Sequence, residues 1–190
     1  MQVFSSNTCA KGFFESKGSK FLGFLTTDSQ MKDLMHSLRV KHQKARHFVS
    51  ASRILNEHSQ IIESFSDDGE PRGSAGMPCL KVLRGENLVG CGCIVVRYFG
   101  GTILGVGGLV RAYTQSVQDC ILHAREQHFI TPFVPKATLE ITIPYSQLSR
   151  LEYEAKKLNL SLHKNAFLES SVQITLCGAC NLIEAFKNKL

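Results

Sequence analysis

Two arginines flanking a glycine-rich loop are the residues of this chain best suited to binding an anion. The segment 67–113 holds eleven of the fifteen glycines, and Arg97 ends an apolar run typical of a buried strand. A helical pattern follows, with Arg111 in its first turn, where free backbone N–H groups attract negative charge. The helix dipole disfavours a cation there, so a phosphate or carboxylate bound between the two arginines would explain the position of each arginine. The candidate anion-binding or nucleic-acid-binding residues are Arg97, Gly100, Gly101, Gly105, Gly107, Gly108, Arg111, His47 and Arg72.

The same loop also has an architectural explanation. Glycines permit close packing of a strand and a helix, and the arginines would then pair with Asp67, Asp68 or Glu70. The sequence leaves binding and packing open as alternatives. Two nucleotide motifs do not fit, because no lysine followed by Ser or Thr comes after Gly105, and a dinucleotide fingerprint needs Gly or Ala at Val110. An ATPase or a Rossmann enzyme is therefore not indicated.

Two further clusters could in principle bind a metal or carry out disulfide exchange. Asp67, Asp68 and Glu70 could bind Mg²⁺, but one loop supplies few oxygen ligands, so a turn held by its own carboxylates is favoured. Cys177 and Cys180 form a Cys-x-x-Cys pair near the chain end, without a second pair to complete a zinc site. We therefore expect structural thiols, no metal, no cofactor and no catalytic residue.

Periodic apolar residues predict the elements that position these groups. We expect an N-terminal α+β domain whose mostly antiparallel sheet of hairpins is backed by two longer helices, with Asp28 or Ser29 capping the first helix. His47 has no partner base or ligand cluster beside it in sequence, which favours a hydrogen-bonded structural role. The expected strands lie near residues 13–14, 21–25, 46–55, 60–65 and 89–98, and the expected helices near 31–42, 78–84 and 109–124.

A proline-containing segment, 131–136, is the expected linker to a second domain. Beyond it the pattern predicts a strand, a helix, two strands and a closing helix, an order that suggests a ferredoxin-like α+β module lacking its last strand. The predicted domains are therefore 1–131 and 136–190.

Several runs in the central stretch resemble the signature of the IMPACT/YigZ family. The resemblance covers about the first 130 residues and extends more weakly to the end, and the matching runs are Asp67–Pro71, Ser74–Pro78, Val96–Gly101, Leu104–Gly105 and Gly107–Tyr113. Ile103 stands where the family usually has lysine. The resemblance implies an N-terminal domain like the second domain of a small-subunit ribosomal protein and a C-terminal domain like one of elongation factor G.

The resemblance also implies a role in translation, since eukaryotic relatives restrain a starvation-responsive initiation-factor kinase. The expected function is therefore a regulatory protein that binds RNA, the ribosome or a translation-regulatory protein through a basic, glycine-rich surface. The alternative is an enzyme acting on a small phosphorylated or carboxylated substrate at the loop. No Ser/Cys–His or HExxH motif supports a peptidase, and binding is favoured over catalysis.

Charge and composition agree with a polyanionic partner in the cytoplasm. The net charge is +6, and residues 1–56 carry nine Lys/Arg against three Asp/Glu. No apolar run is long enough to span a membrane, and no leader pattern begins the chain. Seven cysteines, an odd number spread unevenly, favour reduced thiols.

Overall fold

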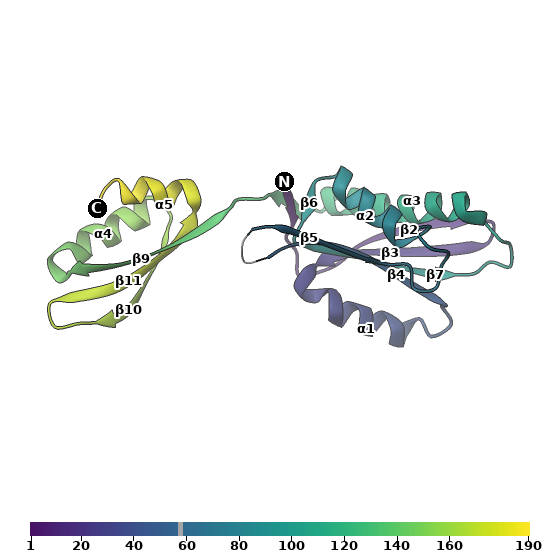
Figure 1. Ribbon diagram of the computed structural model, residues 1–190, viewed down its shortest axis with the longest axis horizontal. Coiled ribbons are helices and arrows are strands. Elements are labelled where there is room, and N and C mark those ends of the chain that lie inside the picture. Colours follow the sequence, from purple (N-terminus) through teal and green to yellow (C-terminus); the bar gives the residue numbers. More distant parts are fainter. Residues whose placement is uncertain (57–58) are drawn as a thin grey trace. The chain divides into compact units, whose positions relative to one another are not determined.

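The proline-containing linker coincides with the place where the chain divides. The computed structural model describes residues 1–56 and 59–190, and its two units are Met1–Phe133 and Val134–Leu190. Each unit has its own sheet and helices (Figure 1). Residues 57 and 58, between the strands expected near 46–55 and 60–65, lie outside the described residues. No described helix is long and apolar enough to cross a membrane.

Five antiparallel strands form the main sheet of the first unit, in the order β2-β3-β7-β4-β5. β7 is central and almost wholly buried, because both of its faces are covered, which explains its continuous apolar run. The hairpins β2–β3 and β4–β5 confirm the antiparallel pairing expected from the sequence. The strands are β2 (Ala10–Ser16), β3 (Ser19–Thr27), β4 (His47–Leu55), β5 (Ile61–Ser66) and β7 (Cys91–Tyr98).

Three helices cover the sheet, one near each of the three expected helical segments. α1 (Met31–Lys41) lies on one face, and α2 (Gly76–Gly85) and α3 (Gly105–Glu126) lie on the other (Figure 1). The expected side-chain cap from Asp28 or Ser29 is absent, because a short 3₁₀ turn, η1 (Asp28–Gln30), leads directly into α1. α2 and α3 also begin earlier than predicted, since glycine at their first positions does not prevent a helical turn.

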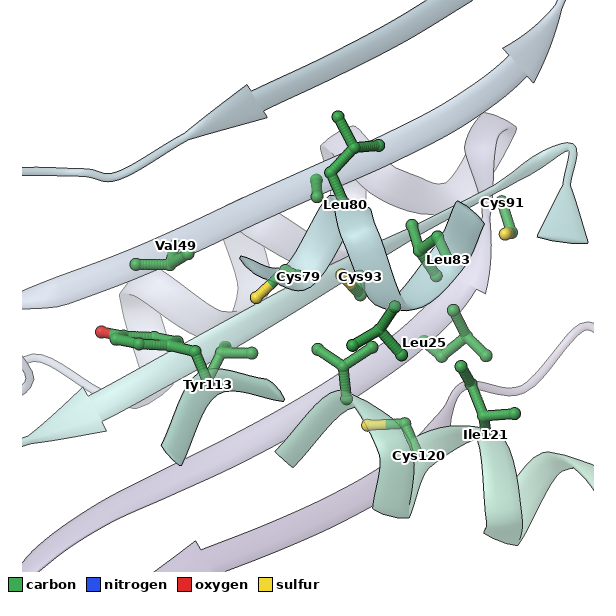
Figure 2. Close-up of a cluster of buried hydrophobic side chains, with 14 of the residues drawn as sticks. Leu25, Val49, Cys79, Leu80, Leu83, Cys91, Cys93, Tyr113, Cys120 and Ile121 are labelled. Atoms are coloured by element: carbon green, nitrogen blue, oxygen red, sulfur yellow. The ribbon is translucent and has the colours of Figure 1, made fainter. Parts of the chain in front are cut away.

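The core between the sheet and α2 and α3 contains four buried cysteines. Figure 2 shows Cys79, Cys91, Cys93 and Cys120 among aliphatic side chains of both layers. α3 approaches β2 and β3 so closely that a methyl group on Gly12 would lie 2.3 Å from the Ser116 carbonyl oxygen. The thiols therefore fill space in the core as small apolar side chains do, and the glycines permit the close approach of α3 to the sheet.

A small second sheet closes the far end of the unit. β1 (Gln2–Phe4) lies between β6 (Leu88–Val89) and β8 (Ile130–Pro132). It pairs in parallel with β6 and antiparallel with β8, so the first residues of the unit are tied to its last.

The second unit has the predicted order of strand, helix, two strands and helix. Its sheet order is β10-β11-β9, and α4 and α5 supply the apolar residues that cover one face. Its elements are β9 (Lys136–Pro144), α4 (Tyr145–Lys157), β10 (Ser161–Phe167), β11 (Ser171–Ala179) and α5 (Cys180–Lys187). The helix–sheet order agrees with the predicted module, whereas the likeness to an elongation factor domain stays a prediction.

Candidate functional site

Four connections of the first unit meet at one end of the five-stranded sheet, opposite β1, β6 and β8 (Figure 1). The register places the β2–β3 turn beside the end of β7, because Lys20 is opposite Tyr98. It also places the start of β4 there, because His47 is opposite Arg97. We call this region the loop end; it comprises residues 16–20, 41–47, 67–75 and 99–108.

The aspartates of the loop end are engaged in holding their own backbone. Asp67 accepts hydrogen bonds from the backbone N–H groups of Gly73, Ala75 and Gly76 at 2.8–3.2 Å. Asp68 accepts one from the Phe48 N–H at 2.6 Å and pairs with Arg39 at 3.2 Å. Their contacts match the turn explanation. The described residues contain no group of three His, Cys, Asp or Glu that could hold a metal ion.

The third carboxylate, Glu70, lies in a buried polar network. Its Oε1 accepts hydrogen bonds from Arg97 Nη1 at 2.6 Å and from the Tyr113 hydroxyl at 2.7 Å. Glu70 is 8% exposed and Arg97 is 6% exposed. The Arg97 guanidinium lies 5.5 Å from the Phe21 ring centre and 5.8 Å from that of Phe99. Buried charges require such pairing, so the network fixes Arg97 in place.

Two features of this network bear on its chemistry. Burial and the hydrogen bond to Glu70 raise the pKa of Tyr113 well above its usual value, so the hydroxyl stays a donor. Among the described residues, the buried Nε of Arg97 has no hydrogen-bond partner. Arg97 is thus neutralised by Glu70, as the packing alternative expected, but its donors are only partly used.

The glycines of the β7–α3 connection serve different purposes. A methyl group on Gly100 would lie 1.9 Å from the Gly18 carbonyl carbon, so this glycine allows the hairpin turn to approach. Gly101 and Gly105 have positive φ angles of 85° and 71°, which glycine adopts without strain. At Gly107 neither close packing nor a positive φ angle requires glycine, since a methyl group there would meet no atom within 4 Å.

Gly108 is the intermediate case. A methyl group there would lie 3.0 Å from the Leu104 Cβ, which is a tight contact. The open backbone of the connection is therefore Gly101, Gly105 and Gly107. It includes the first turn of α3, whose N–H groups have no partner within the helix.

A pocket of about 280 Å³ lies between this connection and the buried network. Glu70 and Arg97 form its polar part, and Phe99, Ile103 and Val106 are among its apolar lining residues. These three apolar side chains are unusually open to solvent, Ile103 being 81% exposed. The site thus combines a buried ion pair with an accessible apolar rim.

The cations around the loop end differ from Arg97 because they are exposed and unpaired. None of them forms an ion pair in the part of the chain that the structure describes, and Glu15, which faces Lys20 across the hairpin, is an exposed acid nearby. These cations are Lys17, Lys20, Lys41, Lys44, Arg46, Arg72 and Arg111. Arg111 is on the same helix face as Gly107, one turn further along α3.

The structure brings most of the candidate residues together but gives them different roles. His47 contacts the carbonyl oxygen of Asp68 through Nδ1 at 2.8 Å, so it supports the acidic loop. Arg72 is exposed in that loop. Sequence reasoning missed Phe99 and Tyr113 as site residues, because an aromatic in an apolar pattern gives no sign of its polar or exposed neighbours.

The second unit holds the Cys-x-x-Cys pair. Cys177 ends β11 and Cys180 begins α5, and both are half-buried free thiols. Cys177 Sγ lies 3.7 Å from Thr138 Oγ1, a weak contact.

Comparisons with known proteins place this geometry in a family. The model of the Impact N-terminal domain matches residues 17–121. An IMPACT family member of Haemophilus influenzae is 31% identical over 179 residues, covering 93% of this chain and 84% of that protein. The IMPACT family member YigZ of Escherichia coli is 36% identical over 143 residues, covering 73% and 67%.

A solved structure described as a hypothetical protein matches the whole architecture. It has a TM-score of 0.71 and 27% identity, and covers 99% of this chain and 90% of its own. The matched domain and the two relatives show that the chain belongs to the IMPACT family.

Proposed function

We propose that the protein regulates translation by binding RNA at the loop end of its first unit. The observation that supports this most is an imbalance of charge. The three carboxylates of residues 67–70 are engaged by backbone groups or by arginines, whereas seven exposed cations around them have no ion-pair partner within the described range. Unpaired cations attract phosphate groups and release counterions when they bind them.

The backbone of the loop offers a second attraction for phosphate. Gly105 and Gly107 leave the first N–H groups of α3 open to approach, and Arg111 follows on the same face. A helix N-terminus with accessible N–H groups favours an anion. The exposed ring of Phe99 would add a surface on which a base can stack.

Regulation of translation is the role that the family resemblance implies, and RNA is the partner that the exposed charges favour. The centre of a protein–protein interface is depleted in charged residues, whereas the loop end carries several unpaired cations. The alternative of an enzyme for a small phosphorylated or carboxylated substrate rests on the same pocket. No residue of the pocket is free to act as a nucleophile or a base, since Glu70 is held by Arg97 and Tyr113.

The test is fluorescence anisotropy of a labelled 20-nucleotide RNA with the full chain, in a series of salt concentrations. We expect the logarithm of the affinity to fall linearly with the logarithm of salt, with a slope of about −0.7 for each contacted phosphate. Lys44→Glu with Arg46→Glu should weaken binding and flatten the slope. Lys32→Glu, at the opposite end of α1, is the matched control and should change neither.

Two outcomes would count against RNA. Absence of binding at low salt, or affinity indifferent to salt, would remove the proposal. Inorganic phosphate bound tightly by the wild type, with no RNA bound, would instead favour a small anionic substrate.

A further inference from the structure

The pocket beside the glycine loop has a polar part that is electrically neutral. Glu70 and Arg97 are both more than nine-tenths buried and paired at 2.6 Å, so their charges cancel. A phosphate placed on this pair would meet the carboxylate of Glu70 as well as the guanidinium. The pocket is therefore poorly suited to an anion and better suited to a neutral group that forms hydrogen bonds.

The same pair still offers unused hydrogen-bonding capacity. Oε1 of Glu70 accepts both of the hydrogen bonds described above, while Arg97 donates to it through Nη1 alone. The Arg97 Nε has no partner among the described residues but is itself buried from solvent, so a ligand would meet the terminal nitrogens of the guanidinium instead. A ligand edge carrying a donor beside an acceptor would complement a carboxylate oxygen beside a guanidinium N–H.

The apolar walls of the pocket are suited to a ligand with flat apolar faces. Phe99 and Ile103 stand on the rim, and Leu104 and Val106 continue the apolar lining. A volume of about 280 Å³ suits a single ring system, since pockets for drug-sized ligands run from about 300 to 1,000 Å³. A nucleobase has two apolar faces and a hydrogen-bonding edge, which matches both the walls and the neutral pair.

We infer that this pocket receives one unstacked base of a single-stranded RNA, which stacks on Phe99 and presents its edge to Glu70 and Arg97. The inference rests on the proposed function and deepens it, because the exposed cations would hold phosphates of any RNA whereas the pocket selects single strands. A base inside a duplex cannot enter such a pocket without leaving its stack.

The first test compares a 12-nucleotide single strand with a duplex of equal length, using anisotropy and the full chain. Phe99→Ala should weaken single-strand binding by between about 5-fold and about 100-fold and leave duplex binding unchanged. Phe13→Ala is the matched control. Phe13 is 50% exposed and Phe99 is 52% exposed, but Phe13 lies on the opposite face of the sheet. It should leave both affinities unchanged.

The second test is photo-crosslinking of the same single strand carrying one 4-thiouridine, with the attachment site mapped by mass spectrometry. We expect attachment within the peptide that contains Phe99. This measurement uses the wild-type protein, so it does not depend on how well a variant folds.

The outcomes separate the pocket from the general RNA surface. If Phe99→Ala binds the single strand as the wild type does, or if the crosslinks map only to other segments, the inference fails while the proposed function stands. Equal affinity for duplex and single strand would also overturn it. If no RNA binds at low salt, both fail, and a protein side chain becomes the candidate occupant.

Discussion

Gly107→Ala separates a glycine that serves the fold from one that serves a partner. Gly107 is exposed in the first turn of α3, and a methyl group there would meet nothing within 4 Å. Its φ angle is not positive, so alanine fits without strain. The substitution should therefore increase the free energy of unfolding, because alanine loses less backbone freedom on folding than glycine.

The gain in stability should be about 0.5–1 kcal/mol, the usual difference between glycine and alanine in a helix. For a unit of this size that corresponds to a rise in Tm of about 2–5 °C. RNA affinity, in contrast, should decrease. If the RNA backbone contacts this turn, the methyl group displaces it and removes a charge-assisted hydrogen bond worth about 1.5–3 kcal/mol, or a loss of about tenfold or more.

The assay is thermal unfolding together with RNA anisotropy on the same preparations. Gly85→Ala is the matched control, since Gly85 ends α2, is exposed, and would also meet no atom within 4 Å. It should leave RNA affinity unchanged. Gly100→Ala is the opposite case, because its methyl group would collide with the backbone of Gly18 at 1.9 Å, and it should lower the Tm. A stabilised Gly107→Ala protein with wild-type RNA affinity would refute the proposed contact.

Four further predictions concern the buried network, the thiols, a histidine and the rim of the pocket. Glu70→Gln leaves Arg97 without its counter-charge and should cost about 3–5 kcal/mol in urea unfolding, partly restored by adding Arg97→Met; an unchanged midpoint would contradict the buried pair. Three of the seven thiols, the half-buried ones, should react with Ellman's reagent at pH 8 in the folded protein, because burial raises the pKa of Cys91 to about 12 and also raises that of Cys120; fast reaction of all seven would contradict the core assignment. Burial and the nearby Lys41 lower the pKa of His42 below its usual 6.5, so stability should fall as pH drops below 6.5, where the unfolded state binds the proton first; a His42→Gln variant with the same pH dependence would show that another group is responsible. Ile103→Lys adds a cation at an 81% exposed position and should steepen the RNA salt slope by about 0.7, and an unchanged slope would place the RNA elsewhere.

The strands and helix faces could be predicted from the sequence because their apolar spacing is local. The hairpins and the face of α1 formed by Met31, Leu34 and Leu38 agree with that pattern. The helix starts could not be predicted, since they depend on backbone geometry that glycine leaves open. η1 replaced the expected cap, and α3 begins at Gly105 although Gly107 and Gly108 look like a break.

The sequence names Glu70 among the possible partners of the two arginines, but it does not tell which arginine is paired. Arg97 and Arg111 carry the same charge and flank the same loop, so the sequence treats them alike. The fold determines which arginine is paired. Arg97 is opposite Phe21 on β3 and lies on the face of the sheet that α3 covers. Glu70 and Tyr113 form the buried network with it on that face. Arg111 is on the exposed side of α3 and has no ion pair among the described residues. A contact between residues 27 positions apart cannot be read from spacing alone.

The Glu70–Arg97 pair also changes where the site can hold charge. With Arg97 neutralised, the uncompensated cations are the exposed ones around the loop end, where the phosphates of an RNA of any sequence can reach them and where salt screens them. The interior of the pocket is suited to ligand groups that form hydrogen bonds but have no charge. Affinity and discrimination are then separable: substitutions of the exposed cations should change the salt slope, whereas removal of the Phe99 ring should change the preference for single strands at constant slope. A pocket variant that flattened the slope would mean that Arg97 contacts phosphate despite its partner.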